Sequence, residues 1–374
     1  MAQSTVKNRL SAVRQSRGIG AADLAERVGV SRQTIYAIEA GSYVPNTEVT
    51  LRLARELEVT VEELFSLPAK DEVGPESLQA EVLSVRSAGK GQAVQVCRIG
   101  ERLVCVPVAA SMYFLPEADG VIAKAGRLKG RAELAVFSTE DHFAKRLILA
   151  GCDPAIGLLA RMVERVSGVE IVSAAASSRL ALDWLARGNV HVAGTHLKDK
   201  ATGEFNVPIV RREYPDEDFV VITFARWEEG FVVAEGNPKG VRGVADLARR
   251  GVKIVNREAG AGSRALLDSL LAQEGMSGFK IAGYARVADG HLAAAAAVRS
   301  GEADCCIATR SAAQALGLGF VPLQTERYDF VLRRASLELP AVQSFLDVLQ
   351  KASLRRKLEV LAGYDTAETG VVLV

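Results

Sequence analysis

The strongest constraint in this sequence is a segment close to its start, from Asp23 to Glu39, in which two helix-forming stretches flank a tight turn at Gly29. Glycine tolerates the positive φ that such a turn requires, and the small side chain of Ala25 lets two helices cross closely. Ser31 stands where the second helix needs an N-cap. The segment therefore predicts a pair of short helices joined by a tight turn.

The second helix of this pair has one apolar face and one polar face. Ile35 and Ile38 are expected to be buried, while the first turn presents arginine and glutamine to solvent. Arginine pairs bidentately with guanine and glutamine with adenine, so this helix suits the major groove of DNA. A helical bundle that serves only protein contacts is the alternative, but six Lys or Arg against three acidic residues within positions 1–40 favour DNA. The residues predicted to contact double-stranded DNA are Ser31, Arg32, Gln33, Thr34, Tyr36 and Tyr43.

Five short helices are expected within residues 1–67, because apolar residues recur at helical spacing in five stretches, the first of which starts at Val6. Asn46 and Thr60 stand where the fourth and fifth helices need N-caps. Glu63 lies three residues after Thr60, which is the spacing of a capping box.

This region resembles the phage-repressor/Cro-like (XRE) helix-turn-helix family over about Val6 to Leu67. The resemblance implies that Arg14 pairs with Glu39, which ends the recognition helix. It departs from the family pattern at Ala21, where a glutamine usually contacts a phosphate. The matching stretches are Leu24–Ser31, Ile38–Gly41, Val44–Pro45 and Leu64–Phe65.

Length, charge and cysteine usage limit the number of domains, the kind of charged surface and the compartment that we expect for this chain. Its 374 residues are too many for one core, so two or three domains are expected. With 46 Lys or Arg against 45 Asp or Glu, any basic surface must be local. No apolar run suits a signal peptide or a membrane span, and five cysteines without a CxxC pair fit a reducing cytosol, so we expect a cytoplasmic protein without a membrane partner. The adjacent pair Cys305–Cys306 favours a buried strand over a redox switch.

A polar linker punctuated by prolines is predicted over residues 68–77, and a small β-rich module over residues 78–144. Within this module, apolar residues recur on both sides of Gly100–Glu101, a pattern that is typical of a β-hairpin. The module contains no residue pattern that indicates chemistry.

From residue 145 to residue 374 strands and helices alternate, which predicts a parallel sheet with ligands bound beyond the carboxyl ends of its strands. A second lobe is expected over about 231–322, with a strand at 252–255. The predicted fold class is thus multidomain: an all-α helix-turn-helix domain, a β-rich module and an α/β two-lobed ligand-binding domain. The strands expected in the first lobe lie at 147–150, 169–172 and 190–193, and the helices at 154–166 and 178–187.

Small polar residues follow the predicted strands of the first lobe, and a glycine-rich loop follows the strand of the second. Backbone N–H groups in such loops and at helix N-termini attract anions, and two arginines add positive charge. Each candidate has a structural alternative, such as a helix cap for Asp153 and a core position for Cys152 or for either histidine. The candidate ligand-binding residues are Cys152, Asp153, Ser177, Ser178, Thr195, His196, Arg257, Gly262, Ser263, Arg264 and His291.

The same region resembles the periplasmic-binding-protein fold in its cytosolic form, which occurs attached to helix-turn-helix regulators and to molybdopterin-biosynthesis proteins. The resemblance implies two lobes that close on a small ligand. It suggests molybdate or tungstate as the effector. We expect no cofactor. The matching stretches are Ala150–Ala155, Val192–Leu197, Gly236–Gly240, Val255–Arg257, Gly260–Arg264 and His291–Ala293.

Together these features favour a ligand-responsive transcription regulator that binds a two-fold DNA operator as a homodimer. The first alternative is an enzyme on the same fold, with Cys152 or His196 in a chemical role. The sequence shows neither a Ser-His-Asp spacing nor a metal-ligand cluster, which counts against an enzyme. The second alternative is a constitutive DNA-binding protein whose large domain only holds a dimer together.

Overall fold

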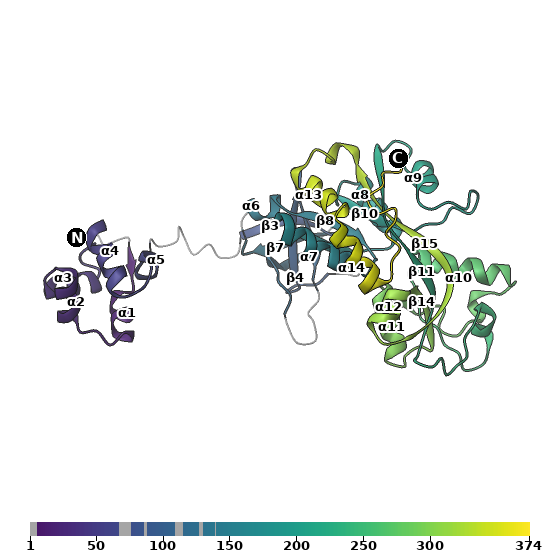
Figure 1. The fold of residues 1–374 in the computed structure, drawn as a ribbon, viewed down its shortest axis with the longest axis horizontal. Helices are drawn as coiled ribbons and strands as arrows, with labels where there is room; N and C mark the ends of the chain where they lie inside the picture. Colours follow the sequence, from purple (N-terminus) through teal and green to yellow (C-terminus); the bar gives the residue numbers. More distant parts are fainter. Residues whose placement is uncertain (1–5, 67–75, 86–87, 109–114, 127–129, 139) are drawn as a thin grey trace. The chain divides into compact units, whose positions relative to one another are not determined.

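The computed structural model of the chain describes residues 6–66, 76–85, 88–108, 115–126, 130–138 and 140–374 (Figure 1). The chain divides into two units, residues 1–74 and residues 75–374. The first unit holds the helix-turn-helix segment, and the second holds the β-rich module and the α/β domain. Among the described residues, no helix is long and apolar enough to cross a membrane.

The first unit contains the five predicted helices within its described residues. The first helix begins at Leu10 rather than at Val6, because Lys7 and Asn8 form strand β1 and pair antiparallel with β2 (Phe65–Ser66). The helices are α1 (Leu10–Ser16), α2 (Ala21–Val28), α3 (Arg32–Glu39), α4 (Thr47–Glu56) and α5 (Val61–Leu64). Their apolar faces pack into one core, whose fully buried members include Leu24, Val28, Ile35 and Leu53.

The turn between α2 and α3 has the predicted conformation, with Gly29 at a φ of 78°. Side chains cap three helices at the predicted positions, Ser31, Asn46 and Thr60, and Thr60 forms its capping box with Glu63. These local interactions satisfy backbone N–H groups that a helix start leaves without partners. The short helices of this unit are therefore defined by residues within and directly beside them.

The β-rich module is a closed five-stranded barrel. Its β4 and β5 form the predicted hairpin around Gly100–Glu101. Most of the predicted linker lies outside the described residues, and its last two residues, Glu76 and Ser77, instead belong to the barrel because they pair with β7. The strands are β3 (Glu76–Val82), β4 (Ala93–Ile99), β5 (Arg102–Pro107), β6 (Gly120–Ala125) and β7 (Arg131–Val136), and α6 (Glu140–Ala144) leads into the α/β domain.

The first lobe of the α/β domain is built on three parallel strands in the order β10, β8, β9, as the alternation predicts. The full sheet has six strands and is mixed rather than parallel, because β15 joins β10 in the antiparallel direction. The elements are β8 (Leu147–Gly151), α7 (Ile156–Ser167), β9 (Ile171–Ala175), α8 (Ser178–Ala186), β10 (Val192–Thr195) and α9 (Val207–Glu213).

Two long strands, β11 (Phe219–Val233) and β15 (Gly319–Arg333), join the two lobes. They pair antiparallel along nearly their whole length, with irregularities between Thr223 and Ala225 and between Glu229 and Gly230. One end of this ribbon pairs with β10 in the first lobe, and the other end pairs with β14 (Cys305–Thr309) in the second. Residues in the middle of the ribbon therefore lie where the lobes meet (Figure 1).

The second lobe differs from the sequence prediction at its expected strand. Residues 252–255 contain only an isolated bridge from Ile254 to Cys305, and the strand β12 is instead Asn256–Arg257, which pairs parallel with β13 (Val287–Ala288). The pair Cys305–Cys306 lies in a buried strand, as expected. The remaining elements are η1 (Val244–Ala248), α10 (Gly262–Gln273), η2 (Gly278–Lys280), α11 (His291–Arg299) and α12 (Arg310–Ala315).

The chain then returns to the first lobe. After η3 (Arg334–Ser336), helices α13 (Pro340–Leu349) and α14 (Ala352–Ala362) follow. Phe345 and Leu358 from these helices lie in the same core as Leu159 of α7 and Phe330 of β15. The C-terminal helices thus complete the core beneath the sheet that carries the site residues.

Candidate functional site

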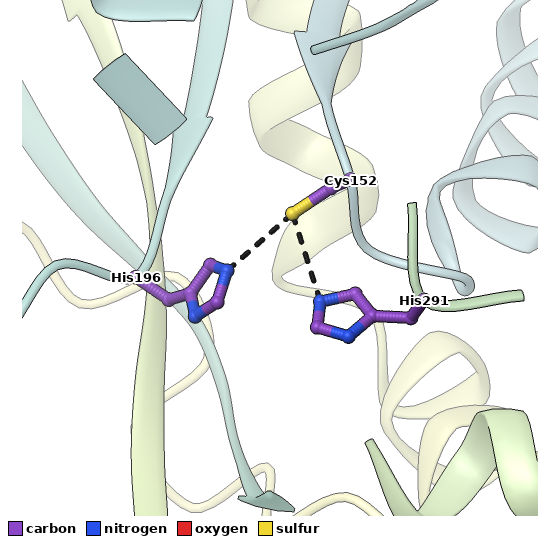
Figure 2. Close-up of side chains that lie close together, drawn as sticks. All are labelled: Cys152, His196 and His291. Carbon is purple, nitrogen blue, oxygen red and sulfur yellow. Dashed lines mark hydrogen bonds between the residues drawn. The ribbon is translucent and has the colours of Figure 1, made fainter. Parts of the chain in front are cut away.

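Three side chains that are far apart in the sequence meet where the two lobes face each other (Figure 2). Cys152 directly follows β8 and His196 directly follows β10, both in the first lobe, whereas His291 begins α11 in the second. The Sγ atom of Cys152 lies 3.4 Å from Nε2 of His196 and 3.7 Å from Nε2 of His291. Both histidines are buried, and the cysteine is half-buried. The fold therefore creates a cluster of a thiol and two imidazoles that the sequence spacing did not reveal.

Two buried carboxylates from the long ribbon stand behind the histidines. Nδ1 of His196 lies 2.6 Å from Oε2 of Glu326 on β15. Nδ1 of His291 lies 3.8 Å from Oε1 of Glu229 on β11, and Ser263 Oγ donates a hydrogen bond to that same oxygen. Sequence reasoning missed both glutamates. For Glu229 the available signal was a largely apolar strand, whereas Glu326 stands among polar residues, Thr325 and Arg327, and gave no such signal.

Aromatic rings fix the position of His196. Its ring lies 5.3 Å from that of Trp227 and 5.9 Å from that of Tyr328, centroid to centroid. The Tyr328 hydroxyl fits against two glycines, because a Cβ added to Gly151 or Gly194 would come within 2.3 Å and 2.0 Å of its oxygen, respectively. These two strand-end glycines are thus required by close packing with a residue from a distant strand, and not by backbone conformation.

Burial and neighbouring groups give the two histidines different charge preferences. Burial alone lowers the pKa of His196, but Cys152 and Glu229 outweigh it, so the pKa of His196 is raised. Burial lowers the pKa of His291 well below its ordinary value. Burial and the nearby Glu326 raise the pKa of Glu229 well above its ordinary value. These directions favour a charged His196 beside a neutral His291 and a protonated Glu229.

A cavity of about 280 Å³ opens beside this cluster, and Cys152, Asp153, Arg257 and His291 contribute to its walls. Arg257 is buried and bonds Glu258 at 3.0 Å, but its Nη1 atom has no hydrogen-bond partner. The N-terminus of α11 borders the cavity and has no side-chain cap. The cavity thus combines a thiol and an imidazole with an incompletely paired guanidinium and free helix N–H groups.

Other predicted ligand-site residues lie in different surroundings and make different contacts. Asp153 accepts a hydrogen bond from Ala155 N at 2.6 Å, so it acts at the start of α7, although its second oxygen is buried without a partner. Gly262 packs against His196, since an added Cβ would lie 2.5 Å from the imidazole ring. Ser177 is buried at the start of α8, close to Gly260 of the second lobe.

Three predicted residues do not line the cavity and have polar partners elsewhere. Thr195 contacts Asn206 at 3.3 Å, and Ser178 accepts a hydrogen bond from the backbone N of His196. Arg264 stacks on the Tyr284 ring at 4.2 Å and pairs with Asp268. Their roles are to hold the backbone and the surface of the second lobe, because their polar atoms are already engaged elsewhere.

In the first unit, the predicted DNA-contacting side chains lie on the exposed face of α3 and after it. Arg32 extends along Tyr36, with its guanidinium 5.2 Å from the ring and a hydrogen bond of 2.8 Å to the hydroxyl. Arg14 pairs with Glu39 at 2.7 Å, as the family resemblance implies, and this pair links α1 to the end of α3. Ser31, Arg32, Gln33, Tyr36 and Tyr43 are exposed, and Thr34 is half-buried.

Comparison with known families agrees with this arrangement. A model described as the PBP superfamily domain matches residues 159–350, and a model described as a helix-turn-helix domain matches residues 8–70. The chain belongs to the PBP superfamily. The predicted fold class is confirmed: a helical helix-turn-helix region precedes a PBP-like α/β domain. This combination of domains is that of a DNA-binding regulator with a ligand-binding domain.

Two relatives match stretches of different length. The protein YvgK of Bacillus subtilis is 32% identical over 239 residues, which are 64% of this chain and 77% of that protein. The HTH-type transcriptional regulator MJ0272 of Methanocaldococcus jannaschii is 40% identical over 60 residues, 16% of this chain and 91% of that protein. Among solved structures, the sulfate-binding protein SubI of Mycobacterium tuberculosis aligns with a TM-score of 0.43 and 18% identity, over 59% of this chain and 86% of that protein.

Proposed function

We propose that this PBP-superfamily regulator senses a small oxyanion, such as molybdate or tungstate, and adjusts its binding to operator DNA in response. The single observation that carries the proposal is the buried Arg257, whose Nη1 atom lacks a partner in the wall of the cavity between the lobes. A buried guanidinium N–H without a partner is costly, and an anion satisfies it with a charge-assisted hydrogen bond. No resident cofactor forms part of the proposal.

Other features of the cavity support an anion. The uncapped start of α11 offers backbone N–H groups and the positive end of a helix dipole. Burial raises the pKa of the neighbouring Asp153 to about 7, so that near neutral pH a large fraction of this carboxyl group carries no charge that would repel an anion. A volume of about 280 Å³ suits a small ligand rather than a peptide or a sugar chain.

Lobe closure is the proposed link between anion binding and DNA binding. Cys152 belongs to the first lobe, whereas Arg257 and His291 belong to the second, so a ligand that contacts all three favours the closed arrangement. Operator binding is proposed for the exposed face of α3, with two copies of the chain on a two-fold site. Sedimentation analysis tests the homodimer. The homodimer is contradicted if the protein is a monomer at micromolar concentration, both free and on DNA.

Calorimetry of chelator-treated protein with molybdate, tungstate and sulfate tests the anion site. We expect Arg257→Gln to weaken anion binding by about 10- to 100-fold, because one charge-assisted hydrogen bond contributes about 1.5–3 kcal/mol. Arg249→Gln is the matched control, since Arg249 is exposed on the second lobe and pairs with Asp246, and it should bind like the wild type. The proposal is wrong if none of the three anions binds, or if Arg257→Gln binds them as tightly as the wild type does.

A second candidate function is catalysis, because Cys152, His196 and Glu326 form a line of thiol, imidazole and carboxylate with separations of 3.4 Å and 2.6 Å. This is the order of nucleophile, base and orienting group that cysteine enzymes use. Such a thiol should react with iodoacetamide faster than free cysteine does, and the labelling should disappear in Cys152→Ala. Labelling of Cys152 no faster than that of free cysteine would exclude this candidate.

A further inference from the structure

We infer that Cys152, His196 and His291 form a binding site for one transition-metal ion, with zinc as the ion that fits the donor set best. The three donor atoms converge from the two lobes toward one point, and each belongs to a residue type that ligates zinc through sulfur or an imidazole nitrogen. The inference concerns a metal ion and not the oxyanion proposed above. The two sites share Cys152 and His291 in the cavity wall, but the metal donor set excludes Arg257, so the inference stands independently of that function.

The two sulfur-to-nitrogen distances match those around a tetrahedral ion. Typical bonds of about 2.3 Å from zinc to sulfur and about 2.0–2.1 Å from zinc to nitrogen place the sulfur about 3.5 Å from each nitrogen. The observed separations from Cys152 Sγ are 3.4 Å to His196 Nε2 and 3.7 Å to His291 Nε2. The sulfur is therefore at the right distance from both nitrogens, and all three donor atoms lie within 4.8 Å of one another.

The groups behind the histidines are those that metal sites use. A ligating histidine usually donates its second ring N–H to a carboxylate, which fixes the tautomer and the ring orientation. Nδ1 of His196 lies 2.6 Å from Glu326, and Nδ1 of His291 faces Glu229 at 3.8 Å. The hydroxyl of Ser263 holds Glu229 in place. Each imidazole thus presents Nε2 to the cluster centre and Nδ1 to a buried carboxylate.

Unpaired atoms in the cluster point to a missing positive charge. Nδ1 of His291 and Oε2 of Glu229 are both buried without a hydrogen-bond partner, which is costly in a protein interior. An ion on Nε2 of His291 leaves the ring proton on Nδ1, where a small rotation brings it to Glu229. An ion also supplies a positive charge beside the buried carboxyl groups of Glu229 and Glu326.

The site is accessible and selective. Cys152 and His291 also line the cavity, so an ion can enter from there and keep one coordination position for water or a ligand. One thiolate and two imidazoles favour zinc, cobalt or copper over magnesium and calcium, which require oxygen ligands. Because the ligands come from both lobes, a bound ion ties the lobes together.

The test is a titration of the metal-free full chain with Co²⁺, a spectroscopic substitute for zinc. We expect one Co²⁺ per chain, a near-ultraviolet band from sulfur-to-cobalt charge transfer, loss of that band on adding Zn²⁺, and no competition by Mg²⁺. Cys152→Ala should abolish the band, and Glu326→Gln should weaken binding by about 10- to 100-fold, as losses of a carboxylate partner of a ligating histidine do. The matched controls Cys105→Ala and His142→Gln lie in or beside the barrel and should bind like the wild type.

Circular dichroism and a Zn²⁺-induced rise in the melting temperature of the wild type separate a lost site from a lost fold. The inference is overturned if the wild type shows no charge-transfer band, or if the band persists in folded Cys152→Ala. Since the anion calorimetry uses chelator-treated protein and Arg257 variants, failure of anion binding and failure of metal binding are separate results.

Discussion

In the helix-turn-helix unit the proposed DNA contacts lie between Ser31 and Tyr43, on one helix and the turn after it, whereas the site of the two-lobed domain draws on residues from Cys152 to Glu326. Their ion pairs span similar sequence separations, 25 and 27 residues, and differ instead in burial. Arg14 and Glu39 have side chains about one-tenth exposed, while Arg146 and Asp119, which join the barrel to the first lobe, are almost fully buried. The first unit depends on local interactions, and the second on contacts between distant segments.

The largest expected effect is on the buried pair of the second unit. Asp119→Ala should lower the free energy of unfolding of the second unit by about 3–5 kcal/mol, because the guanidinium of Arg146 is left buried with only part of its partners. Urea unfolding followed by tryptophan fluorescence measures this, since Trp184 and Trp227 both lie in the second unit. Asp216→Ala, at an exposed position, should change the stability by less than about 0.5 kcal/mol. Equal stability of the two variants would contradict the contrast.

A buried histidine should make the second unit sensitive to acid. Burial lowers the pKa of His191 from 6.5 to about 4 in the folded chain. The unfolded chain therefore binds more protons below pH 6.5, and stability falls as the pH drops from about 6.5 to about 4, by about 3 kcal/mol in total. His191→Gln removes this loss, so its stability should depend less on pH in that window. The free energy of unfolding is measured in urea at several pH values. The same dependence of that free energy on pH in the variant and the wild type would refute the prediction.

In the first unit, Arg32→Ala should weaken operator binding by about 1–3 kcal/mol, because the proposed bidentate contact of Arg32 to one base is removed. Ligand binding to the second unit should not change, since Arg32 belongs to the helix-turn-helix unit alone. Footprinting and calorimetry on the same protein measure both quantities. Unchanged operator affinity and preference would remove α3 as the recognition helix.

The smallest effect is expected at the turn of the first unit. Gly29→Ala should lower the free energy of unfolding of the first unit by about 1–2 kcal/mol, because a residue with a Cβ is strained at a φ of 78°. Faster amide hydrogen exchange in α2 and α3, with unchanged tryptophan fluorescence, is the expected signature. A spread of the effect to both units would show that the turn is not a local feature.

The sequence by itself determined the features that depend on neighbouring residues. Helical spacing and the caps Ser31, Asn46 and Thr60 were sufficient for the five helices of the first unit, and the alternation of strands and helices for the first lobe. It failed at the strand 252–255, because pairing with β13 selects Asn256–Arg257 instead. It also expected a wholly parallel sheet, which the antiparallel β15 contradicts.

Only the tertiary structure decided the composition of the site. Cys152 and His291 are 139 residues apart in the sequence, and no local pattern predicts that their side chains meet. Glu229 and Glu326 resemble ordinary strand residues until the β11–β15 ribbon places them behind the histidines. The physical reason is that helix caps and turns are satisfied within a few residues, whereas a buried cluster of polar groups exists only where the packing of distant strands excludes water.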